Sequence, residues 1–296
     1  MDPAPTSVAV RSRPRRALPA TRAVLAVFAV LSTLAVISLF FFSDRTDEWF
    51  AWTIAPPLTA CFFGACFGST LVIEVLSLRQ RAWAPIRVNA LAVFVFAALT
   101  LAATLLHLDK FHLTADTAAT VQAQAAAWFW LIVYIVVPVA LPVLMVLQER
   151  AAGADPPDRH PVPGGLRVAL GLEGAVLLVV GILLYAAPSA ATTVWPWPLT
   201  PLTSQATGAW LIAFGLVSGI TAAAGDLARQ RGATIAYTVL GVLVLIATVR
   251  FRGTIAWGEP SAWVFLGMAV AITVTGAAGW RLAPPAREYA EESRNG

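Results

Sequence analysis

The sequence predicts an all-α membrane protein, a polytopic bundle of about eight transmembrane helices arranged as two parallel four-helix repeats. The membrane class follows from composition, because 58% of the residues are hydrophobic and 12% are charged. A soluble chain is about a quarter charged, and each charge at bilayer depth costs several kcal/mol. The repeat is predicted by short motifs that recur in the same order in both halves.

A spanning helix needs about 20 mostly apolar residues. Eight stretches qualify: 22–42, 57–77, 87–108, 126–148, 167–187, 206–226, 233–250 and 261–281. The first lacks a small-residue cleavage site, so we interpret it as an uncleaved span rather than a signal peptide. The polar segment 113–125 resembles a helical lead-in to the fourth span. The predicted regions are a basic tail 1–21, a first half 22–148, a linker 149–166 rich in proline and glycine, a second half 167–281 and a tail 282–296.

Basic residues alternate between the two sets of loops. One set holds sixteen of the 20 basic residues: Arg11, Arg13, Arg15, Arg16, Arg22, Arg79, Arg81, Arg87, Arg150, Arg159, Arg167, Arg229, Arg231, Arg281, Arg287 and Arg294. The other set holds Arg45, Lys110, Arg250 and Arg252. Because cytoplasmic loops are enriched in basic residues, both termini are expected in the cytoplasm. The excess of arginine over lysine is typical of GC-rich coding, and we expect the plasma membrane of a bacterium.

Tryptophans mark the other boundary of the predicted spans. They are Trp49, Trp52, Trp128, Trp130, Trp195, Trp197, Trp257 and Trp263. Indole rings favour the headgroup region because they are apolar with one N–H donor. We interpret these side chains as an anchoring belt, with an aromatic vestibule as the alternative. Trp210 is an exception, since it lies inside a span.

The repeat rests on matched anchors. Arg22 opens the first span and Arg167 the fifth, while Pro-Leu-Thr begins the second at Pro57 and the sixth at Pro201. Arg-Gln-Arg follows both of these spans, and Ala-Trp opens the fourth and the eighth. Helix-end chemistry explains part of the likeness, because proline suits the first turn of a helix. The order of the anchors is not explained in this way, and it favours a duplication.

Glycines and prolines within the spans predict packing and bending. Gly64 and Gly68 are four residues apart, as are Gly215 and Gly219. Such pairs form a smooth face that another helix can approach closely. We therefore expect the second and sixth spans to form the central contact between the halves. In the fourth span, Pro138 and Pro142 each remove a helical hydrogen bond and predict kinks.

Three acidic residues are the candidate intramembrane functional groups. Glu74 lies near the arginine-rich end of the second span, Glu173 lies six residues into the fifth, and Asp226 ends the sixth. Acids at membrane depth mark functional sites unless they reach headgroups or an arginine. Glu173 is the strongest candidate, because a carboxyl group so deep must be protonated, paired or adjacent to a wet cavity.

An outer polar cluster follows the third span, where His107, Asp109 and His112 occur within the sequence "HLDKFH". A zinc site needs converging ligands at set distances, and these three cannot share one helical face. We therefore predict no metal. A pH-responsive loop and an ordinary polar helix end both remain open, since histidine titrates near neutrality.

The sequence indicates no specific activity. No zinc-protease motif, Walker loop, nucleophile elbow or dinucleotide fingerprint occurs in it, so enzymatic activity is not favoured and no cofactor is predicted. The basic residues follow one membrane face, which argues against nucleic-acid binding. The lipid bilayer is the expected partner, with a membrane protein or a second copy of the chain as further options. Two functions remain, a non-catalytic membrane component, which we favour, and a transporter or permease with a site between the halves.

Overall fold

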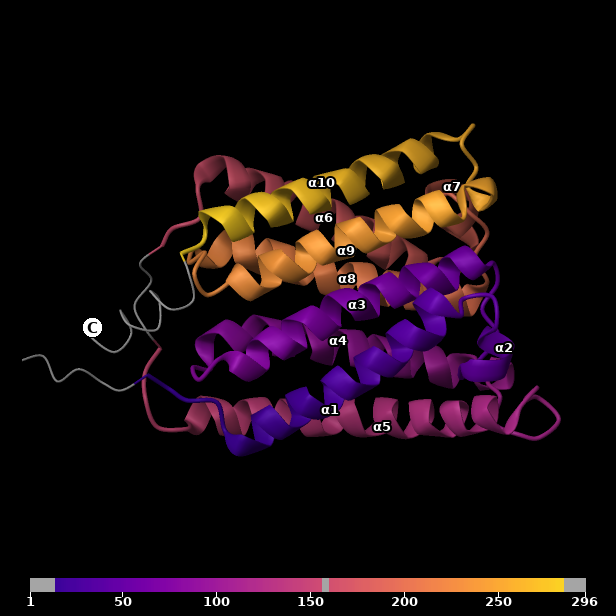
Figure 1. The fold of residues 1–296 in the computed structure, drawn as a ribbon, viewed down its shortest axis with the longest axis horizontal. Coiled ribbons are helices and arrows are strands. Elements are labelled where there is room, and N and C mark those ends of the chain that lie inside the picture. The colour runs from indigo at the N-terminus through magenta and orange to yellow at the C-terminus, as the bar shows by residue number, and fades with distance from the viewer. Residues whose placement is uncertain (1–13, 156–159, 285–296) are drawn as a thin grey trace, which may run out of the picture.

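The computed structural model describes residues 14–155 and 160–284, which form a helical bundle (Figure 1). Eight of the described helices are long and apolar enough to cross a membrane, which confirms the predicted fold class. The spans are α1 Pro19–Val36 with its π-helical continuation η1 Ile37–Phe41, α3 Pro57–Arg79, α4 Ala84–Leu106, α5 Val121–Arg150, α6 Gly164–Ala186, α8 Pro201–Ala224, α9 Arg231–Arg250 and α10 Pro260–Leu282. The short helices are α2 Thr46–Trp49, η2 Leu108–Lys110, η3 Pro188–Ala190, α7 Ala191–Val194 and η4 Arg252–Thr254.

Most spans begin a few residues before their predicted apolar stretch, because prolines and polar residues form the first turn. Helices α3, α8 and α10 carry proline there, where the missing N–H has no helical partner in any case. Segment 113–125 is helical only from Val121. The Thr120 hydroxyl caps α5 by accepting a hydrogen bond from the Ala123 N–H at 3.0 Å.

The spans form two layers of four helices (Figure 1). One layer contains α10, α9, α3 and α1 in that order, and the other contains α6, α8, α4 and α5. The start of α1 and the end of α10 lie at the same end of the bundle. We call this the arginine-rich end because Arg15, Arg22, Arg79 and Arg281 lie there, and the opposite end, with Trp49 and Trp195, the tryptophan-rich end.

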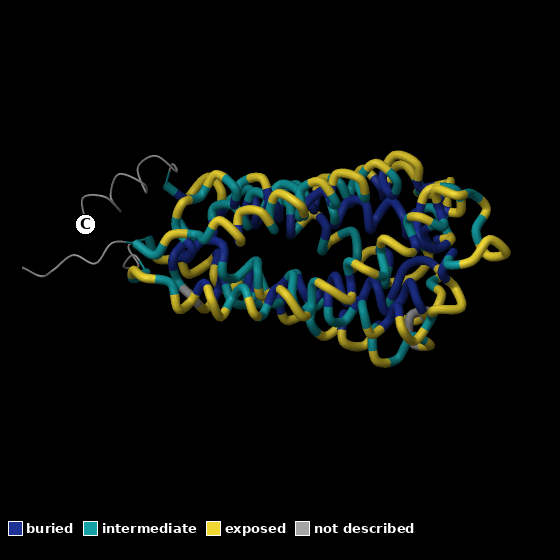
Figure 2. Tube along the Cα trace, turned by 90° about the horizontal axis from the view of Figure 1, so that it is seen from below, coloured by how far each residue is buried: buried dark blue, intermediate teal, exposed yellow. Residues whose placement is uncertain are grey.

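Burial divides the spans into central and peripheral helices. More than half of the apolar window of α8 and α3 is buried, 61% and 56%, against 11% for α5 and 17% for α1. Exposed residues lie on the outside of both layers and buried residues between them (Figure 2). The exposed side chains of α5 are apolar, including Val139 at 69% and Val143 at 57%. An apolar exterior of this kind is compatible with a lipid environment and not with water.

The structure corrects the predicted central contact between the halves. Helices α3 and α8 touch only briefly, and the main contacts are α3 with α9 and α8 with α4. A Cβ atom on Gly68 would lie 2.6 Å from Leu243 of α9, whereas one on Gly64 would lie 2.5 Å from the backbone nitrogen of Phe40 in its own half. Gly215 faces α6, and a Cβ on Gly219 would meet no atom within 4 Å.

Arg250 of α9 holds the π-helical end of α1. Its guanidinium donates hydrogen bonds to the carbonyl oxygens of Phe40 at 2.6 Å and Phe41 at 3.4 Å. The last carbonyls of a helix lack helical partners, and at membrane depth an unsatisfied carbonyl costs several kcal/mol. Arg250 therefore stabilises an irregular helix end that is distant in sequence.

Replacing Arg250 with glutamine is expected to loosen η1 and to lower the thermal midpoint of the detergent-solubilised protein. A charged hydrogen bond is worth about 1.5–3 kcal/mol when buried, and because Arg250 is exposed, solvent screening reduces the expected loss to about 1–2 kcal/mol. Thermal unfolding followed by tryptophan fluorescence measures the change. Arg250 and Arg252 are both exposed, and Arg252→Gln is the matched control because the Arg252 side chain makes no hydrogen bond or ion pair with the described residues. Equal midpoints for the two variants would contradict this role of Arg250.

Candidate functional site

A cavity of about 790 Å³ lies within the first half of the protein. Helices α1, α3, α4 and α5 form its walls, together with η1, the segment around α2 and one residue of α8, Trp210. Ligand sites in proteins commonly have volumes of about 300–1,000 Å³. We call this space the first-half cavity.

The first-half cavity opens toward the outside of the bundle. Its lining includes side chains with large exposed fractions, among them Leu34 at 56%, Phe129 at 50% and Trp49 at 47%. Helices α1 and α5 contribute many of the lining residues but make few contacts with each other. Because these two helices are also the least buried spans, the opening faces the surface that an apolar environment covers.

Glu74 of α3 is the charged group of this cavity. It is 5% exposed, and its Oε1 atom accepts a hydrogen bond from the Ser32 hydroxyl of α1 at 3.1 Å. Its Oε2 atom has no hydrogen-bond partner among the described residues. A buried carboxyl oxygen without a partner is costly, so Glu74 is the least satisfied polar side chain of the cavity wall described so far.

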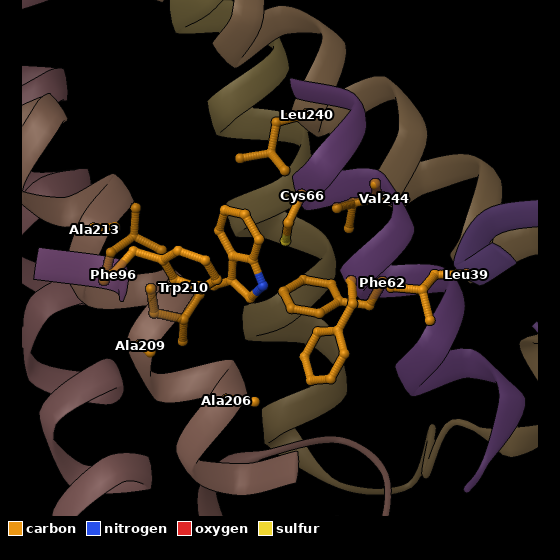
Figure 3. Packing of buried hydrophobic residues seen from close by; sticks show 14 of the residues in the cluster. Leu39, Phe62, Cys66, Phe96, Ala206, Ala209, Trp210, Ala213, Leu240 and Val244 are labelled. Atoms are coloured by element: carbon orange, nitrogen blue, oxygen red, sulfur yellow. The ribbon is translucent and has the colours of Figure 1, made fainter. Parts of the chain in front are cut away.

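Aromatic rings form much of the cavity wall. Trp130 and Tyr134 of α5 lie with ring centroids 4.2 Å apart, and Tyr134 lies 6.0 Å from Phe96 of α4. Trp210 of α8 packs against Phe96 with centroids 3.9 Å apart (Figure 3). Phe50 completes the row, at 5.4 Å from Trp130. The aromatic row extends from the tryptophan-rich end toward Glu74.

A smaller pocket of about 40 Å³ lies on the other side of Glu74. Thr21, Ser77, Trp83 and Asn89 are among its lining residues, and Glu74 lines both spaces. Glu74, together with Phe28 and Val93, therefore lies between the large cavity and a small, mostly apolar pocket directed toward the arginine-rich end.

A cluster of side chains around Glu149 closes the arginine-rich end beyond this pocket. The Glu149 carboxylate accepts hydrogen bonds from Trp83 at 2.6 Å and from Arg87 at 2.5 and 2.9 Å, and it also pairs with Arg15. Arg87 makes a second ion pair with Asp155 at 2.8 Å. We call Glu149, Arg15, Trp83 and Arg87 the Glu149 cluster. It joins the segment before α1 to α4 and α5.

The second half is packed more closely, and a pocket between its helices α6, α8, α9 and α10 measures about 80 Å³. Helices α6 and α8 approach so closely that a Cβ atom on Gly208 would lie 2.6 Å from the Gly181 oxygen. Helices α9 and α10 meet in a similar way, since a Cβ on Gly241 would lie 2.8 Å from the Thr273 backbone nitrogen and 2.9 Å from the Ala269 oxygen. Glycine-to-backbone contact removes the space that remains open in the first half.

Glu173, the strongest candidate from the sequence, lies within this second half. It is 6% exposed, and its Oε2 atom accepts a hydrogen bond from Thr275 of α10 at 3.0 Å. The Tyr237 hydroxyl, also in this half, accepts a hydrogen bond from Ser218 at 3.4 Å. Glu173 does not line the first-half cavity. Its hydrogen bond comes from a helix of its own half.

Asp226 differs from the prediction, because it lies in a turn and not in a span. Helix α8 ends at Ala224, and Gly225 has a φ of 78°, the left-handed conformation that ends many helices. The Asp226 carboxylate then accepts hydrogen bonds from the N–H groups of Ala228 at 2.9 Å and Arg229 at 3.4 Å. It also approaches the Arg229 guanidinium at 3.7 Å. These contacts give it a local role in turning the chain.

The structure disperses the outer polar cluster. His107 contacts Gln205 of α8 at 3.0 Å, whereas His112 lies 3.1 Å from the Thr53 hydroxyl and 3.0 Å from the Phe50 carbonyl. Asp109 pairs with Lys110, whose hydrogen bond holds the pKa of that carboxyl below its ordinary value. Within residues 14–155 and 160–284, no group of three or more His, Cys, Asp or Glu residues could hold a metal.

Pro138 and Pro142 do not interrupt α5, which is helical from Val121 to Arg150. Both lie on the span that contributes Tyr134 and Val137 to the first-half cavity. Their effect on the path of the helix remains a prediction.

The tryptophans predicted as a belt differ in exposure, with Trp130 and Trp257 intermediate. Trp49, Trp128 and Trp263 are exposed by about half or more, as anchoring residues are, at 47%, 50% and 61%. Trp52, Trp195 and Trp197 are buried at 3%, 6% and 2% and pack against other aromatic rings.

Sequence reasoning did not identify Ser32, Tyr134 or the aromatic row as parts of a site. The placement of Trp210 inside a span was the only signal that pointed toward it. Comparisons with protein-family models, with curated proteins and with solved structures found no match.

Proposed function

We propose that the protein is a transporter or permease that binds a lipophilic small molecule in the first-half cavity. The observation that carries this proposal is the cavity of about 790 Å³ with one buried carboxyl group, Glu74, at its inner limit. A non-catalytic membrane component, the function favoured from the sequence, would be better served by a closed and dry interior. The site lies within one half, and not between the halves as we expect from the sequence.

The arrangement of the two spaces around Glu74 supports movement through the first half. The large cavity leads from the tryptophan-rich end and from the open side between α1 and α5 to Glu74. The small pocket continues beyond Glu74 to Trp83, where the Glu149 cluster closes the path. In the proposed cycle, a solute enters from the bilayer side, rests against Glu74 and leaves after the Glu149 cluster opens.

We further propose that the protein lies in a bacterial plasma membrane with both termini in the cytoplasm. The support is the distribution of arginine, which concentrates at one end of the bundle. In this orientation the Glu149 cluster faces the cytoplasm and the first-half cavity begins near the outer surface.

A duplication of four spans is the proposed origin of the fold. The first anchor pair, Arg22 and Arg167, relates Phe40 to Tyr185, and the second, Pro57 and Pro201, relates Gly64 to Gly208. A Cβ on Gly64 would meet the backbone of Phe40 at 2.5 Å, and one on Gly208 would meet the backbone of Tyr185 at 2.8 Å. The helix contacts also correspond, since α1–α3 matches α6–α8, α4–α5 matches α9–α10, and α3–α9 matches α8–α4. Independent helix packing gives no reason for this agreement.

Filling the first-half cavity tests the proposed function. Ala126 of α5 lines the cavity, whereas Ala140 of the same helix is exposed and does not. Ala126→Trp and Ala140→Trp each add one indole ring, so they are matched. The probes are neutral N-phenyl-1-naphthylamine, anionic tetraphenylborate and cationic tetraphenylphosphonium, with binding to the full-length protein in nanodiscs measured against empty nanodiscs.

At least one of the three probes is expected to bind saturably to the wild type and to Ala140→Trp. Ala126→Trp is expected to reduce that binding at least about tenfold, because a bulky ring removes space from the site. Export of the same probe from energised cells is expected to follow the same order among the variants. Absence of saturable binding for all three probes, or equal binding and export by both tryptophan variants, contradicts the proposal.

A further inference from the structure

We infer that the ligand of the first-half cavity is a lipophilic organic cation, for which Glu74 is the counter-ion and the aromatic row is the wall. This inference rests on the proposed binding role of the cavity and adds the substrate class. Three observations carry it: the sign of the charge in the cavity, the state of the Glu74 oxygens and the composition of the wall.

The only acidic or basic side chain that lines the cavity is an acid. Glu74 is the only charged residue among the described residues that line it. The arginines of the bundle lie at its ends, and the nearest described basic groups on α1 and α4, Arg22 and Arg87, hydrogen-bond to the Gln80 carbonyl and to Glu149. An anionic ligand would therefore find no compensating charge in the cavity, and a buried charge without a partner is strongly unfavourable.

Only one of the two Glu74 carboxyl oxygens has a hydrogen-bond partner among the described residues, so the other is available to a ligand. Ser32 occupies Oε1 at 3.1 Å, whereas Oε2 is buried without a partner in the described chain. Glu173 provides an internal comparison. It is buried to a similar degree, but Thr275 donates to it, and neither of its oxygens is a buried atom without a partner. Of these two buried acids, only Glu74, which lines the large cavity, has a buried carboxyl oxygen without a hydrogen-bond partner among the described residues.

The wall of the cavity favours a cation with a large apolar surface. Phe50, Trp130, Tyr134, Phe96 and Trp210 form a continuous row of rings. Aromatic faces attract cations, tryptophan most strongly, and they do so best where water is excluded. A small ammonium group would lose its strong hydration here, because Ser32, Ser38, Thr70 and Gln122 are the few polar neutral side chains of the lining. A quaternary ammonium, a phosphonium or a delocalised aromatic cation loses less.

Probes of equal shape and opposite charge test the inference. Tetraphenylphosphonium and tetraphenylborate have the same four rings around a central atom that carries opposite charge. We expect the wild-type protein in nanodiscs to bind the phosphonium at least about tenfold more tightly than the borate, after correction for partition into empty nanodiscs. Glu74→Gln is expected to reduce phosphonium affinity at least about tenfold, because the amide keeps the size of the side chain and removes its charge. Glu173→Gln is the matched control and is expected to leave phosphonium affinity unchanged.

The outcomes separate this inference from the proposed function. If N-phenyl-1-naphthylamine binds with sensitivity to Ala126→Trp while the two charged probes bind equally, the cavity is a ligand site and the cation inference is wrong. Equal loss of phosphonium affinity in Glu74→Gln and Glu173→Gln would also contradict the inference, since it would indicate a general effect of removing a buried acid. If no probe binds, both the site and the inference fail. The comparison of the charged probes on the wild type remains decisive if Glu74→Gln does not fold.

Discussion

Gly208→Ala is expected to destabilise the second half by about 1–3 kcal/mol, which is the usual cost of overpacking a close contact. The added methyl group would lie 2.6 Å from the Gly181 oxygen and 2.8 Å from the Tyr185 nitrogen. Both are backbone atoms, so they cannot rotate away as the end of a side chain can. Helices α6 and α8 must then separate, and they form one of the most extensive contacts in the protein.

Gly219→Ala is the matched control on the same helix. A Cβ atom at Gly219 would meet nothing within 4 Å, so the substitution keeps the packing. Alanine favours a helix over glycine by about 1 kcal/mol, and Gly219→Ala is therefore expected to preserve or raise the thermal midpoint. Thermal unfolding of the solubilised proteins, followed by tryptophan fluorescence, measures both changes. A Gly208→Ala midpoint equal to or above that of Gly219→Ala would show that α6 and α8 do not approach as closely as described.

Glu149→Gln is expected to open the arginine-rich end of the first half. The substitution removes the negative charge shared by Arg15, Trp83 and Arg87 and leaves two arginines close together. Hydrogen bonds to charged groups contribute about 1.5–3 kcal/mol when buried. The Glu149 side chain is 42% exposed, so solvent screening reduces the expected loss to about 1–2 kcal/mol.

Hydrogen exchange detects this opening at two backbone contacts. The Ala17 N–H donates to the Arg81 oxygen and the Trp83 N–H donates to the Arg15 oxygen, both at 2.9 Å. Deuterium uptake at these amides is expected to rise in Glu149→Gln, and cavity-bound probe is expected to leave the protein faster. Glu48→Gln is the control, since Glu48 pairs with Arg45 at 3.7 Å at the other end of the bundle. Unchanged exchange at both amides would show that the Glu149 cluster does not hold this end closed.

The number and class of the spans could be predicted because they depend on local properties of the sequence. Length and apolarity define a span, and proline and arginine mark its ends, as at Pro57 and Arg79. The helix neighbours could not be predicted in the same way. The four glycines share one local pattern, but a Cβ on Gly68 would meet α9 of the other half, those on Gly64 and Gly215 would meet helices of their own half, and one on Gly219 would meet nothing within 4 Å. Which face of a helix packs against a neighbouring helix depends on residues that are distant in the sequence.

The candidate site shows the same limit. Glu74 and Glu173 are both acids within apolar spans, and the sequence ranks the deeper one first. The structure distinguishes them by their neighbours, since Thr275 donates to Glu173 whereas Glu74 lines a large cavity. The cavity exists because α1 and α5 make few contacts with each other. In the second half, glycines let α6 pack closely against α8 and α9 against α10. A cavity is not marked by any residue or motif in the sequence.

The contact between Arg250 and the end of α1 has a consequence for biosynthesis. The guanidinium and the Phe40 carbonyl that it contacts are separated by 210 residues, a distance that a ribosome covers in roughly 10–40 seconds at about 5–20 residues per second. During that time the first span is already in the bilayer while the helix that secures its far end has not been made. Until α9 has been made, the first half therefore lacks the contact that holds the end of α1 beside the first-half cavity. The shape of the first-half cavity thus depends on a part of the chain that is synthesised late. We expect a first half expressed alone to insert into the membrane without holding the cavity in the shape described for the full chain.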